Sequence, residues 1–213
     1  MLIVLTGIDG AGKTTAARAL VDAARQAQTG ALLLGNYAGR RSMSLLSDSL
    51  GVHLPRALAD VIETAIRSFN VLVSHRRARR FRGLVVMDRD LHCQLALRHM
   101  HGLARGRLLP LLIRALPQPD LVIYLDVEPR VAHKRILARG TDSERIEDLE
   151  ALRQAYLALP EFPGFTCVPA NGPPSELLAR LQAAIKAAGG SPARKHSPAG
   201  APLPEPAETT PRR

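Results

Sequence analysis

The sequence predicts an α/β fold in which a five-stranded parallel sheet lies between two layers of helices. Two observations predict it. Short apolar runs alternate with longer segments of helical periodicity, which is typical of βαβ units. The runs are also apolar almost throughout, as expected for strands that are covered on both faces. With 213 residues, of which 46% are hydrophobic, the chain is long enough to bury one substantial core.

The elements follow one another in a regular order along the chain. Strands are expected over residues 2–5, 31–34, 84–87, 121–125 and 165–168. Helices are expected over residues 13–28, 42–50, 56–81, 90–104, 107–115, 129–138, 146–158 and 174–188, with Pro129 and Pro174 in first turns. From Gly189 the chain is rich in Pro, Ala, Gly, Ser and Thr, without periodic apolar positions. We therefore expect one domain over residues 1–188 and a disordered tail over residues 189–213.

Composition narrows the classes of partner. The formal net charge is +10, which favours anionic ligands. Aromatic residues make up only 3%, and the basic residues are scattered apart from a cluster at 76–80, so we do not expect a nucleic-acid partner. Cys93 and Cys167 are too few and too far apart for a disulfide framework. No apolar run approaches the length of a membrane span, and no signal-peptide pattern precedes the first strand, so we expect a cytoplasmic protein without a membrane partner.

A glycine-rich loop carries the strongest functional signal. The segment from Gly7 to Thr14, GIDGAGKT, matches G-x-x-x-x-G-K-[ST] in full, after a strand and before a helix. Its glycines let backbone N–H groups approach phosphate oxygens, and the helix start adds its positive dipole end. The pattern predicts a P-loop NTPase in a three-layer αβα arrangement that binds ATP with Mg²⁺. The residues expected to bind this donor are Gly7, Asp9, Gly10, Ala11, Gly12, Lys13, Thr14 and Thr15.

Roles within the loop follow from its chemistry. Lys13 is expected to reach the β- and γ-phosphates, and the Thr14 hydroxyl to be a ligand of Mg²⁺. No guanine-reading Asn-Lys-x-Asp sequence occurs, and the chain is short for a molecular motor. Both absences favour a small-molecule kinase.

A second polar cluster follows the strand at 84–87. Ligands of open α/β sheets lie beyond the carboxyl ends of the strands, so Asp88, Arg89 and Asp90 should face the glycine-rich loop. Asp88 is expected to hold a water on Mg²⁺ or to orient the attacking oxygen, and Arg89 to clamp an acceptor phosphate. The alternative is a loop whose charges only pair at the surface.

These motifs together resemble those of the thymidylate kinases. The likeness rests on residues 6–15, 88–89, 119–127, 139–140, 144–147 and 156–157. It implies transfer of the γ-phosphoryl group of ATP, with Mg²⁺, to a nucleoside monophosphate, most of all dTMP to dTDP. It also implies a homodimer.

The resemblance further implies roles for particular residues. Asp9 would lie near the acceptor sugar and the metal, Arg89 would hold the acceptor phosphate, and Arg67 would contact the base or the phosphate. A short lid is expected over residues 139–145. Because the loop carries no arginine in its variable positions, lid arginines would supply positive charge to the transferring phosphoryl group. The candidates are Arg135, Arg139 and Arg145, and Arg139 is the first choice as the catalytic one.

The acceptor side departs from the family pattern. Family aromatic positions fall on Glu63, Asp90 and Leu97, and a family serine with its polar neighbour falls on Cys93 and Gln94. The segment 36–41 replaces a proline-containing loop. In one interpretation, an acceptor of different shape or charge is bound by Arg40, Arg41, Arg67 and Arg98. In the other, the alignment is shifted and Phe69 stacks on the base.

Two further functions stay open at this point. A related kinase for a nucleoside or another small molecule would use Asp88 as a base on a hydroxyl group, and Arg89 would need no phosphate. A nucleotide-binding regulatory module would lack turnover, and the intact Lys13, Thr14 and Asp88 argue against it.

Overall fold

The structure is a computed structural model that describes residues 1–36, 56–140 and 144–190. In this part of the chain, five strands form one parallel sheet in the order β2-β3-β1-β4-β5. The strands are β1 (Leu2–Thr6), β2 (Ala31–Gly35), β3 (Leu84–Asp88), β4 (Leu121–Asp126) and β5 (Thr166–Pro169). Each lies within one residue of its expected bounds, which confirms the predicted α/β class.

Seven α-helices accompany the sheet in the described residues. They are α1 (Lys13–Gln26), α3 (Arg56–Arg80), α4 (Leu91–Met100), α5 (Leu108–Ala115), α6 (Pro129–Arg139), α7 (Ile146–Leu157) and α8 (Pro174–Gly190), with a 3₁₀ turn η1 (Phe162–Gly164). The helix expected over 42–50, the residues Arg40 and Arg41, and the tail from 191 lie outside the described residues.

Three helices differ from expectation by two residues or more at their ends. Helix α1 ends at Gln26, two residues before its expected end. We expected a helix over 90–104, but α4 begins after Asp90, whose side chain caps it by accepting from the His92 backbone N–H. It ends near Gly102, whose φ of 66° favours glycine and interrupts the helix. Helix α8 continues through Gly190, two residues past the expected domain boundary.

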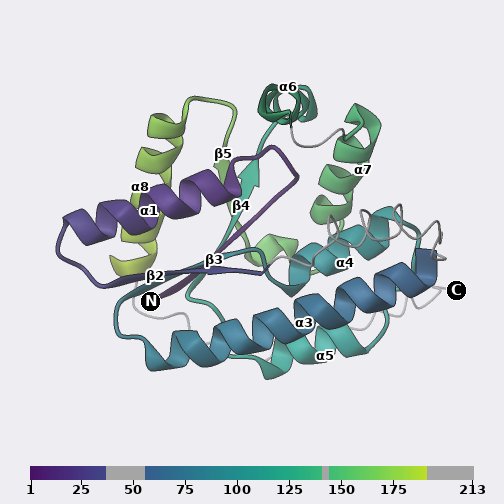
Figure 1. Cartoon of the computed structure of the whole chain (residues 1–213), viewed down its shortest axis with the longest axis horizontal. Helices are drawn as coiled ribbons and strands as arrows, with labels where there is room; N and C mark the ends of the chain where they lie inside the picture. The colour runs from purple at the N-terminus through teal and green to yellow at the C-terminus, as the bar shows by residue number, and fades with distance from the viewer. Residues whose placement is uncertain (37–55, 141–143, 191–213) are drawn as a thin grey trace, which may run out of the picture.

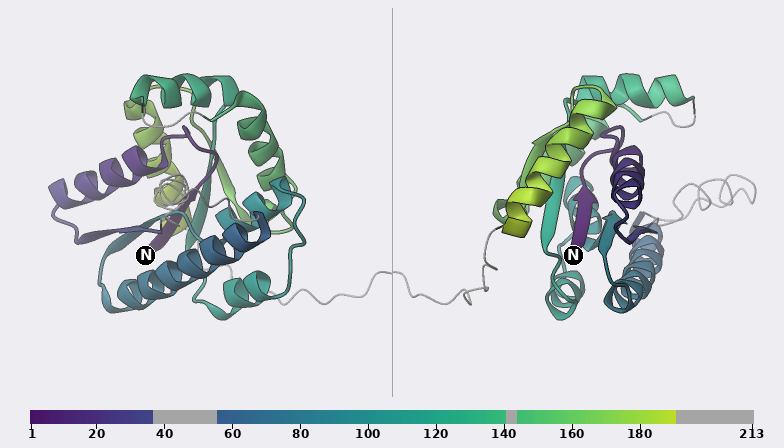
Figure 2. Two further views of the ribbon diagram at one scale, coloured as in Figure 1. Left: turned by 45° about the vertical axis from the view of Figure 1, so that its right-hand side comes forward. Right: turned by 90° about the vertical axis from the view of Figure 1, so that its left-hand side faces the viewer.

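The helices cover both faces of the sheet. Helices α1 and α8 pack on each other and on one face, whereas α3 and α4 lie together on the other side (Figure 1). Helices α5 and α7 both pack on α4. Both views of Figure 2 place α6 beyond the edge of these layers, at the end of the molecule that also holds the loop between β1 and α1.

The strand order brings the loop after β1 and the loop after β3 to the same crevice. Strand β1 lies between β3 and β4, and the chain passes from β1 to a helix on one face and later returns to the other side of β1. Such reversals open a ligand crevice at the carboxyl ends of the strands. The register pairs Leu5 with Asp88, so the loop after β1 and the loop after β3 start at the same level.

Leucine, valine, isoleucine and alanine dominate the core, in which Tyr124 and Tyr156 are the largest fully buried side chains. None of the helices in the described ranges combines the length and the hydrophobicity that a membrane crossing requires.

Candidate active site

The loop between β1 and α1 is shaped by glycines that approach other backbone closely. Gly7 has φ 139°, and a Cβ there would lie 2.8 Å from the Leu125 carbonyl oxygen of β4. Gly10 has φ 78°, and a Cβ would lie 2.5 Å from the Ala132 carbonyl oxygen of α6. Both positions therefore require glycine for conformation and for space. The contact with Ala132 also fixes the loop against the helix that leads to the expected lid.

Lys13 begins α1 and folds back over this loop. Its Nζ donates to the carbonyl oxygens of Gly7 at 2.9 Å and Ile8 at 2.6 Å, and the residue is only 4% exposed. Burial and the nearby Arg89 lower the pKa of Lys13, while Asp9 and Asp88 oppose that shift. The ammonium group of Lys13 therefore lies inside the loop, where phosphate oxygens could replace the carbonyl oxygens of Gly7 and Ile8 as its hydrogen-bond acceptors.

Thr14 and Asp88 meet between β3 and α1. The Thr14 hydroxyl donates to Oδ2 of Asp88 at 2.5 Å. Hydroxyl and carboxylate oxygens are the protein ligands that Mg²⁺ prefers, usually one or two of them with phosphate and water completing the shell. Among the described residues, no group of three or more His, Cys, Asp or Glu side chains is placed to hold a metal by itself. The pair therefore fits a magnesium ion carried by a nucleotide.

Arg89 has an unusual backbone. Its φ is 74°, a left-handed conformation that costs a non-glycine residue about 1–3 kcal/mol. Two hydrogen bonds hold it: the Arg89 N–H donates to the Leu5 carbonyl at 3.0 Å, and the Asn36 amide donates to the Arg89 carbonyl at 2.7 Å. Strain that the surroundings maintain in this way is typical of functional residues. It turns the guanidinium toward the glycine-rich loop.

Asp9 joins the two cations of the site. Its Oδ1 accepts from Nη2 of Arg89 and lies 3.6 Å from Nζ of Lys13. Burial raises the pKa of Asp9, but Arg89 and Lys13 together hold it well below its usual range. The same contact raises the pKa of Arg89, against the effect of burial. The predicted residues Asp9, Lys13, Thr14, Asp88 and Arg89 are thus brought into one cluster.

A second, buried network supports this cluster from α3 and α4. Arg67 donates to Oε1 of Glu63 at 3.1 Å, to Oε1 of Gln94 at 3.1 Å and to the Asn36 carbonyl at 3.2 Å. Asn36 is fully buried, and its side chain also accepts from Ser74 at 2.6 Å. Arg67 is therefore held by a carboxylate, an amide and a backbone carbonyl at once. It also lies near the buried Cys93, whose pKa it lowers, and its contact with an acceptor stays a prediction.

The structure places Phe69 on the opposite side of α3 from Arg67, which disfavours the alternative in which Phe69 stacks on the base. Phe69 is 66% exposed, whereas Glu63 and Arg67 are buried. In a helix, residues four apart share a face, and a residue two positions further lies on the opposite side. Arg98, another candidate contact, donates to the Ala104 carbonyl at 3.0 and 2.7 Å and so braces the loop after α4.

Cys93 lies beneath the guanidinium of Arg89. Its sulfur accepts from Nη1 of Arg89 at 3.8 Å, and the thiol is buried. Burial raises the pKa of Cys93, but Arg67, Arg89 and a hydrogen bond with Tyr156 together lower it by more. Tyr156, on α7, accepts a hydrogen bond from Thr6 at 2.9 Å and lies next to Cys93. Through this contact α7 is tied to the end of β1.

The three expected lid arginines occupy different surroundings. Arg135 donates to the carbonyl oxygens of residues 170, 171 and 172, in the loop after β5. Arg139 ends α6 and is exposed. Arg145 precedes α7 and pairs with Glu147 at 3.2 Å, with both side chains largely exposed. Residues 141–143 lie outside the described residues, so the structure describes only the two ends of the segment over which a lid is expected.

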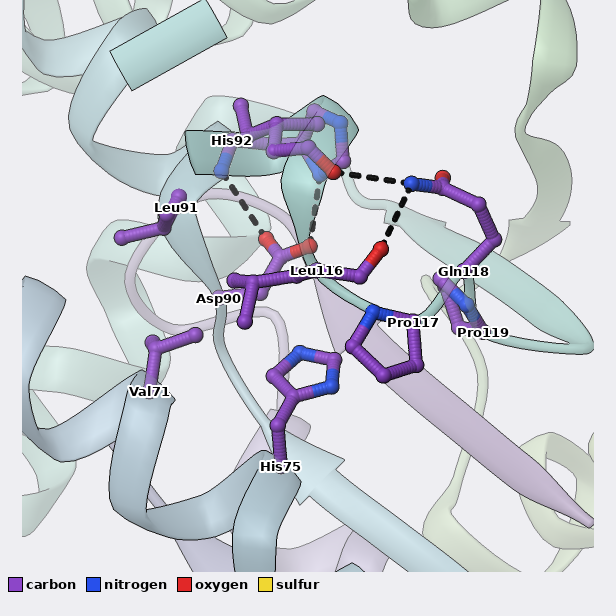
Figure 3. A pocket seen from close by; sticks show the side chains of 10 residues that line it. Val71, His75, Asp90, Leu91, His92, Leu116, Pro117, Gln118 and Pro119 are labelled. Carbon is purple, nitrogen blue, oxygen red and sulfur yellow. Dashed lines mark hydrogen bonds and ion pairs between the residues drawn. The ribbon is translucent and has the colours of Figure 1, made fainter. Parts of the chain in front are cut away.

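A buried charge pair stands where the family has an aromatic residue. Asp90 caps α4 and also contacts Nδ1 of His92 at 2.6 Å, while His75 of α3 approaches from the other side (Figure 3). These side chains border a cavity of about 20 Å³, which is room for about one water molecule. Nδ1 of His75 is buried and has no hydrogen-bond partner among the described residues. Asp90 therefore serves the start of α4 rather than the acceptor.

Two participants were not singled out from the sequence. Asn36 follows β2 directly, and its place at the carboxyl end of a strand is the signal that would have found it. Glu144 lies within hydrogen-bonding reach of Asp9, and its backbone carbonyl contacts Nδ1 of His133 at 2.8 Å. Its position next to the expected lid gave no comparable signal, because the contact depends on how α6 and α7 pack.

The fold and the geometry of this cluster define the class of protein: a P-loop phosphotransferase, in which the glycine-rich loop and Arg89 meet at Asp9. The model of the thymidylate kinase family matches residues 5–180. The chain therefore belongs to the thymidylate kinase family, and it is a kinase whose phosphate donor is ATP.

Curated relatives agree in length and name. A thymidylate kinase of Xanthomonas campestris pv. campestris (strain B100) is 30% identical over 200 residues, which cover 88% of this chain and 84% of the relative. A thymidylate kinase of Xanthomonas oryzae pv. oryzae (strain PXO99A) is 31% identical over 196 residues, with 88% and 84% covered. A probable thymidylate kinase of Pyrobaculum aerophilum is 29% identical over 196 residues, covering 86% of this chain and 95% of the relative.

Proposed function

We propose that the protein transfers the γ-phosphoryl group of ATP to dTMP, giving dTDP and ADP. One observation carries the proposal. Lys13, a donor-phosphate ligand by motif, and Arg89, from the other side of the crevice, contact the same oxygen of Asp9. Two cations that converge on one carboxylate mark two phosphate sites a few ångströms apart. Membership in the family and the names of the relatives support dTMP as the acceptor.

In this reaction the protein positions the two phosphates and forms no covalent intermediate with them. A phosphate oxygen of dTMP attacks the γ-phosphorus, a new P–O bond forms, and the bond to the β–γ bridging oxygen breaks, so that its electron pair leaves with ADP. Lys13 exchanges its two carbonyl partners for β- and γ-oxygens, and the loop N–H groups bind the same phosphates. Arg89 holds the attacking phosphate in line, with its planar fork on two oxygens.

Thr14 and Asp88 would hold the magnesium ion of the nucleotide, Thr14 directly and Asp88 directly or through water. A bound magnesium ion neutralises charge on the β- and γ-phosphates. In the same proposal, Arg139 and Arg145 move over the γ-phosphoryl group when the 139–145 segment closes, and Arg135 contacts the donor from the loop after β5. Closure also excludes water and so suppresses hydrolysis of ATP.

An ADP-release assay with ATP, Mg²⁺ and a panel of acceptors tests the function. We expect stimulation by dTMP at least about a hundredfold above the basal rate with water, because a bound acceptor gains the effective concentration that water lacks. Stimulation only by nucleosides or non-nucleotides would instead support a kinase for a hydroxyl acceptor. No stimulation by any acceptor, with ATP still bound, would support a regulatory module.

We also propose that the protein forms a homodimer through the outer face of α3. Large apolar side chains are exposed along this helix: Leu58, Val61, Ile66, Phe69, Leu72 and Val73. A contiguous apolar face of this kind marks a contact site. Light scattering at micromolar concentration should give twice the chain mass, and Phe69→Glu should give the monomer. A monomeric wild-type protein would contradict the proposal.

A further inference from the structure

The end of α3 and the loop after it carry five exposed arginines, which we call the arginine cluster. Its members are Arg76, Arg77, Arg79, Arg80 and Arg82. Within the described ranges, none of their side chains makes a hydrogen bond or an ion pair. A helix C-terminus attracts cations, but like charges this close on a helix also repel one another. The cluster therefore favours an anionic partner.

The cluster lies at the opposite end of the sheet from the active site. Helix α3 follows β2 and precedes β3, which run parallel, so α3 ends where the strands begin. In Figure 1 this end of α3 lies on the left with the loop from α1 to β2, away from α6 and α7. The active-site loops follow the carboxyl ends of β1 and β3. The reaction proposed above therefore makes no use of the cluster.

Folding brings a sixth arginine to this end of the sheet. Arg25, in the last turn of α1, is exposed and donates to the Ala31 carbonyl oxygen at the start of β2, at 3.4 Å. The loop before β2 lies against the cluster, because a Cβ at Gly30 would lie 3.2 Å from the Arg82 carbonyl oxygen. The expectation of no nucleic-acid partner rested on scattered basic residues. It did not include this juxtaposition, because Arg25 is far from the cluster in the sequence.

Two carboxylates at this end offset only part of the charge. Asp22 lies 3.9 Å from Arg25, and both side chains are largely exposed, so solvent screens the pair. Asp120 accepts from the Leu2 backbone N–H at 2.6 Å, at the start of β1. Even with both carboxylates ionised, six arginines leave this surface strongly positive.

The chemistry of the surface favours the phosphate backbone of a nucleic acid. All of the cations are arginines, whose planar fork binds two phosphate oxygens at once. A membrane surface would also require apolar side chains that insert into it, and none of the large ones is exposed between residues 74 and 90. Leu72 and Val73, one turn earlier, belong to the apolar face proposed for the dimer. Duplex DNA carries one charge per about 1.7 Å of its axis, so several arginines can meet phosphates together.

We propose that the arginine cluster, together with Arg25, binds the phosphate backbone of duplex nucleic acid without regard to base sequence. Arginines on phosphates release counterions from the duplex, so the affinity falls as the salt concentration rises. The crevice stays open to nucleotides while the duplex is bound, because the two surfaces lie at opposite ends of the sheet. This binding does not depend on which acceptor the kinase uses.

Fluorescence anisotropy with a labelled DNA duplex of about 20 base pairs tests the binding. We expect a Kd of about 1–10 µM at 50 mM salt and a loss of affinity of about tenfold between 50 and 100 mM, as for about four phosphate contacts. A second duplex of different base sequence should bind within twofold. An absence of binding at 50 mM salt with 100 µM protein, or a strong preference between the two duplexes, overturns the inference.

Variants connect the binding to the cluster. The triple variant Arg76→Ala, Arg77→Ala, Arg80→Ala should weaken binding at least tenfold and reduce its dependence on salt. The control removes the same charge by alanine substitution at three exposed positions elsewhere: Arg107, Arg130 and Lys134. It should keep the Kd within threefold of wild type. Equal losses in the two triple variants would mean that binding follows net charge alone, and would overturn the assignment.

Two further measurements separate the alternatives. Urea unfolding midpoints equal to that of wild type show that both triple variants fold, whether or not dTMP is the acceptor. Co-sedimentation with vesicles that contain about a quarter phosphatidylglycerol, at the same salt, should show weaker binding than the duplex. Tighter binding to the vesicles would overturn the choice of a nucleic acid. If the duplex binds as expected and dTMP is not phosphorylated, only the proposed function fails.

Discussion

The donor half of the crevice is formed mainly by backbone groups, whereas the acceptor half is formed mainly by side chains. The donor half consists mainly of backbone: a loop whose glycines at 7 and 10 admit close neighbours, with Lys13 and Thr14 at the start of one helix. The half that we propose for the acceptor consists of side chains from α3, α4, the strand ends and α7, including the Glu63–Arg67 pair. A backbone-built site is fixed by one short stretch of sequence. A side-chain-built site can change its ligand by exchanging single residues while the fold stays the same.

The largest effect on the donor half is expected from a substitution of Lys13. Lys13→Ala removes the buried ammonium group that we propose binds the donor phosphates, so kcat should fall about a thousandfold, as when a preorganised charge contact to a transition state is lost. Single-turnover assays with saturating dTMP measure this step. Lys134→Ala, which removes an exposed lysine of α6, is the control and should keep kcat. A loss below tenfold would show that the donor half does not depend on this loop.

The acceptor half should respond in stability as well as in binding. Glu63→Ala leaves the buried Arg67 guanidinium without its carboxylate, which should lower the free energy of unfolding by about 3 kcal/mol and raise KM for dTMP. Urea unfolding and steady-state kinetics measure the two effects. Glu63→Gln keeps an acceptor oxygen and should cost less.

The exposed pair of Asp22 and Arg25 on α1, 3.9 Å apart, offers the matched control. Asp22→Ala should change the free energy of unfolding by less than about 1 kcal/mol, because solvent screens such pairs. Equal losses at Glu63 and Asp22 would contradict the view that the acceptor half is a desolvated network.

The same contrast explains what the sequence predicted. Residues 7–14 and the strand pattern determined the donor half and the sheet, because glycine spacing and apolar periodicity are local properties. Asp88 and Arg89 were also predictable, since the carboxyl ends of parallel strands share an edge. Glu63 lies four residues before Arg67 on the same helix, so that pair is a local property of the predicted helix. Gln94 and Asn36 were not predictable as partners of Arg67, because they come from other elements whose packing sets the distances. The role of Asp90 as a helix cap was hidden by its place next to Arg89.

Arg139 tests whether the donor half is complete without the lid. Arg139→Ala should lower kcat about a hundredfold while the Kd for ATP changes by less than about threefold, because the guanidinium is needed only when charge builds up on the transferring group. Nucleotide titration and turnover assays separate the two quantities. Arg130→Ala, on the same helix and also exposed, is the control. Weaker ATP binding with an unchanged kcat would assign Arg139 to binding alone.

The smallest effect is expected at the N-terminal end of α4, where Asp90 and His92 form a buried pair. Burial lowers the pKa of His92, but Asp90 raises it by more, with Glu161 adding to the rise and Arg105 opposing it. A raised pKa in the folded state means that the charged pair stabilises the protein fully below the ordinary value near 6.5, and that this part is lost as the pH rises through the folded-state pKa. The partner Asp90, whose pKa is lowered by His92 despite burial, loses its contribution only in acid.

Urea unfolding of wild type and His92→Gln at pH 5.5 and pH 9 therefore measures the pair. We expect wild type to be more stable than the variant by about 1–2 kcal/mol at pH 5.5, with a smaller difference at pH 9. The comparison with a variant is needed because burial lowers the pKa of the neighbouring His75, and that group destabilises the folded state as the pH falls below 6.5. Subtracting one protein from the other removes most of this opposite trend, and the remainder measures the coupling of His75 to the pair through Asp90. A difference that grows toward pH 9 would mean that His92 is held neutral, and that Asp90 caps α4 without the help of a charged partner.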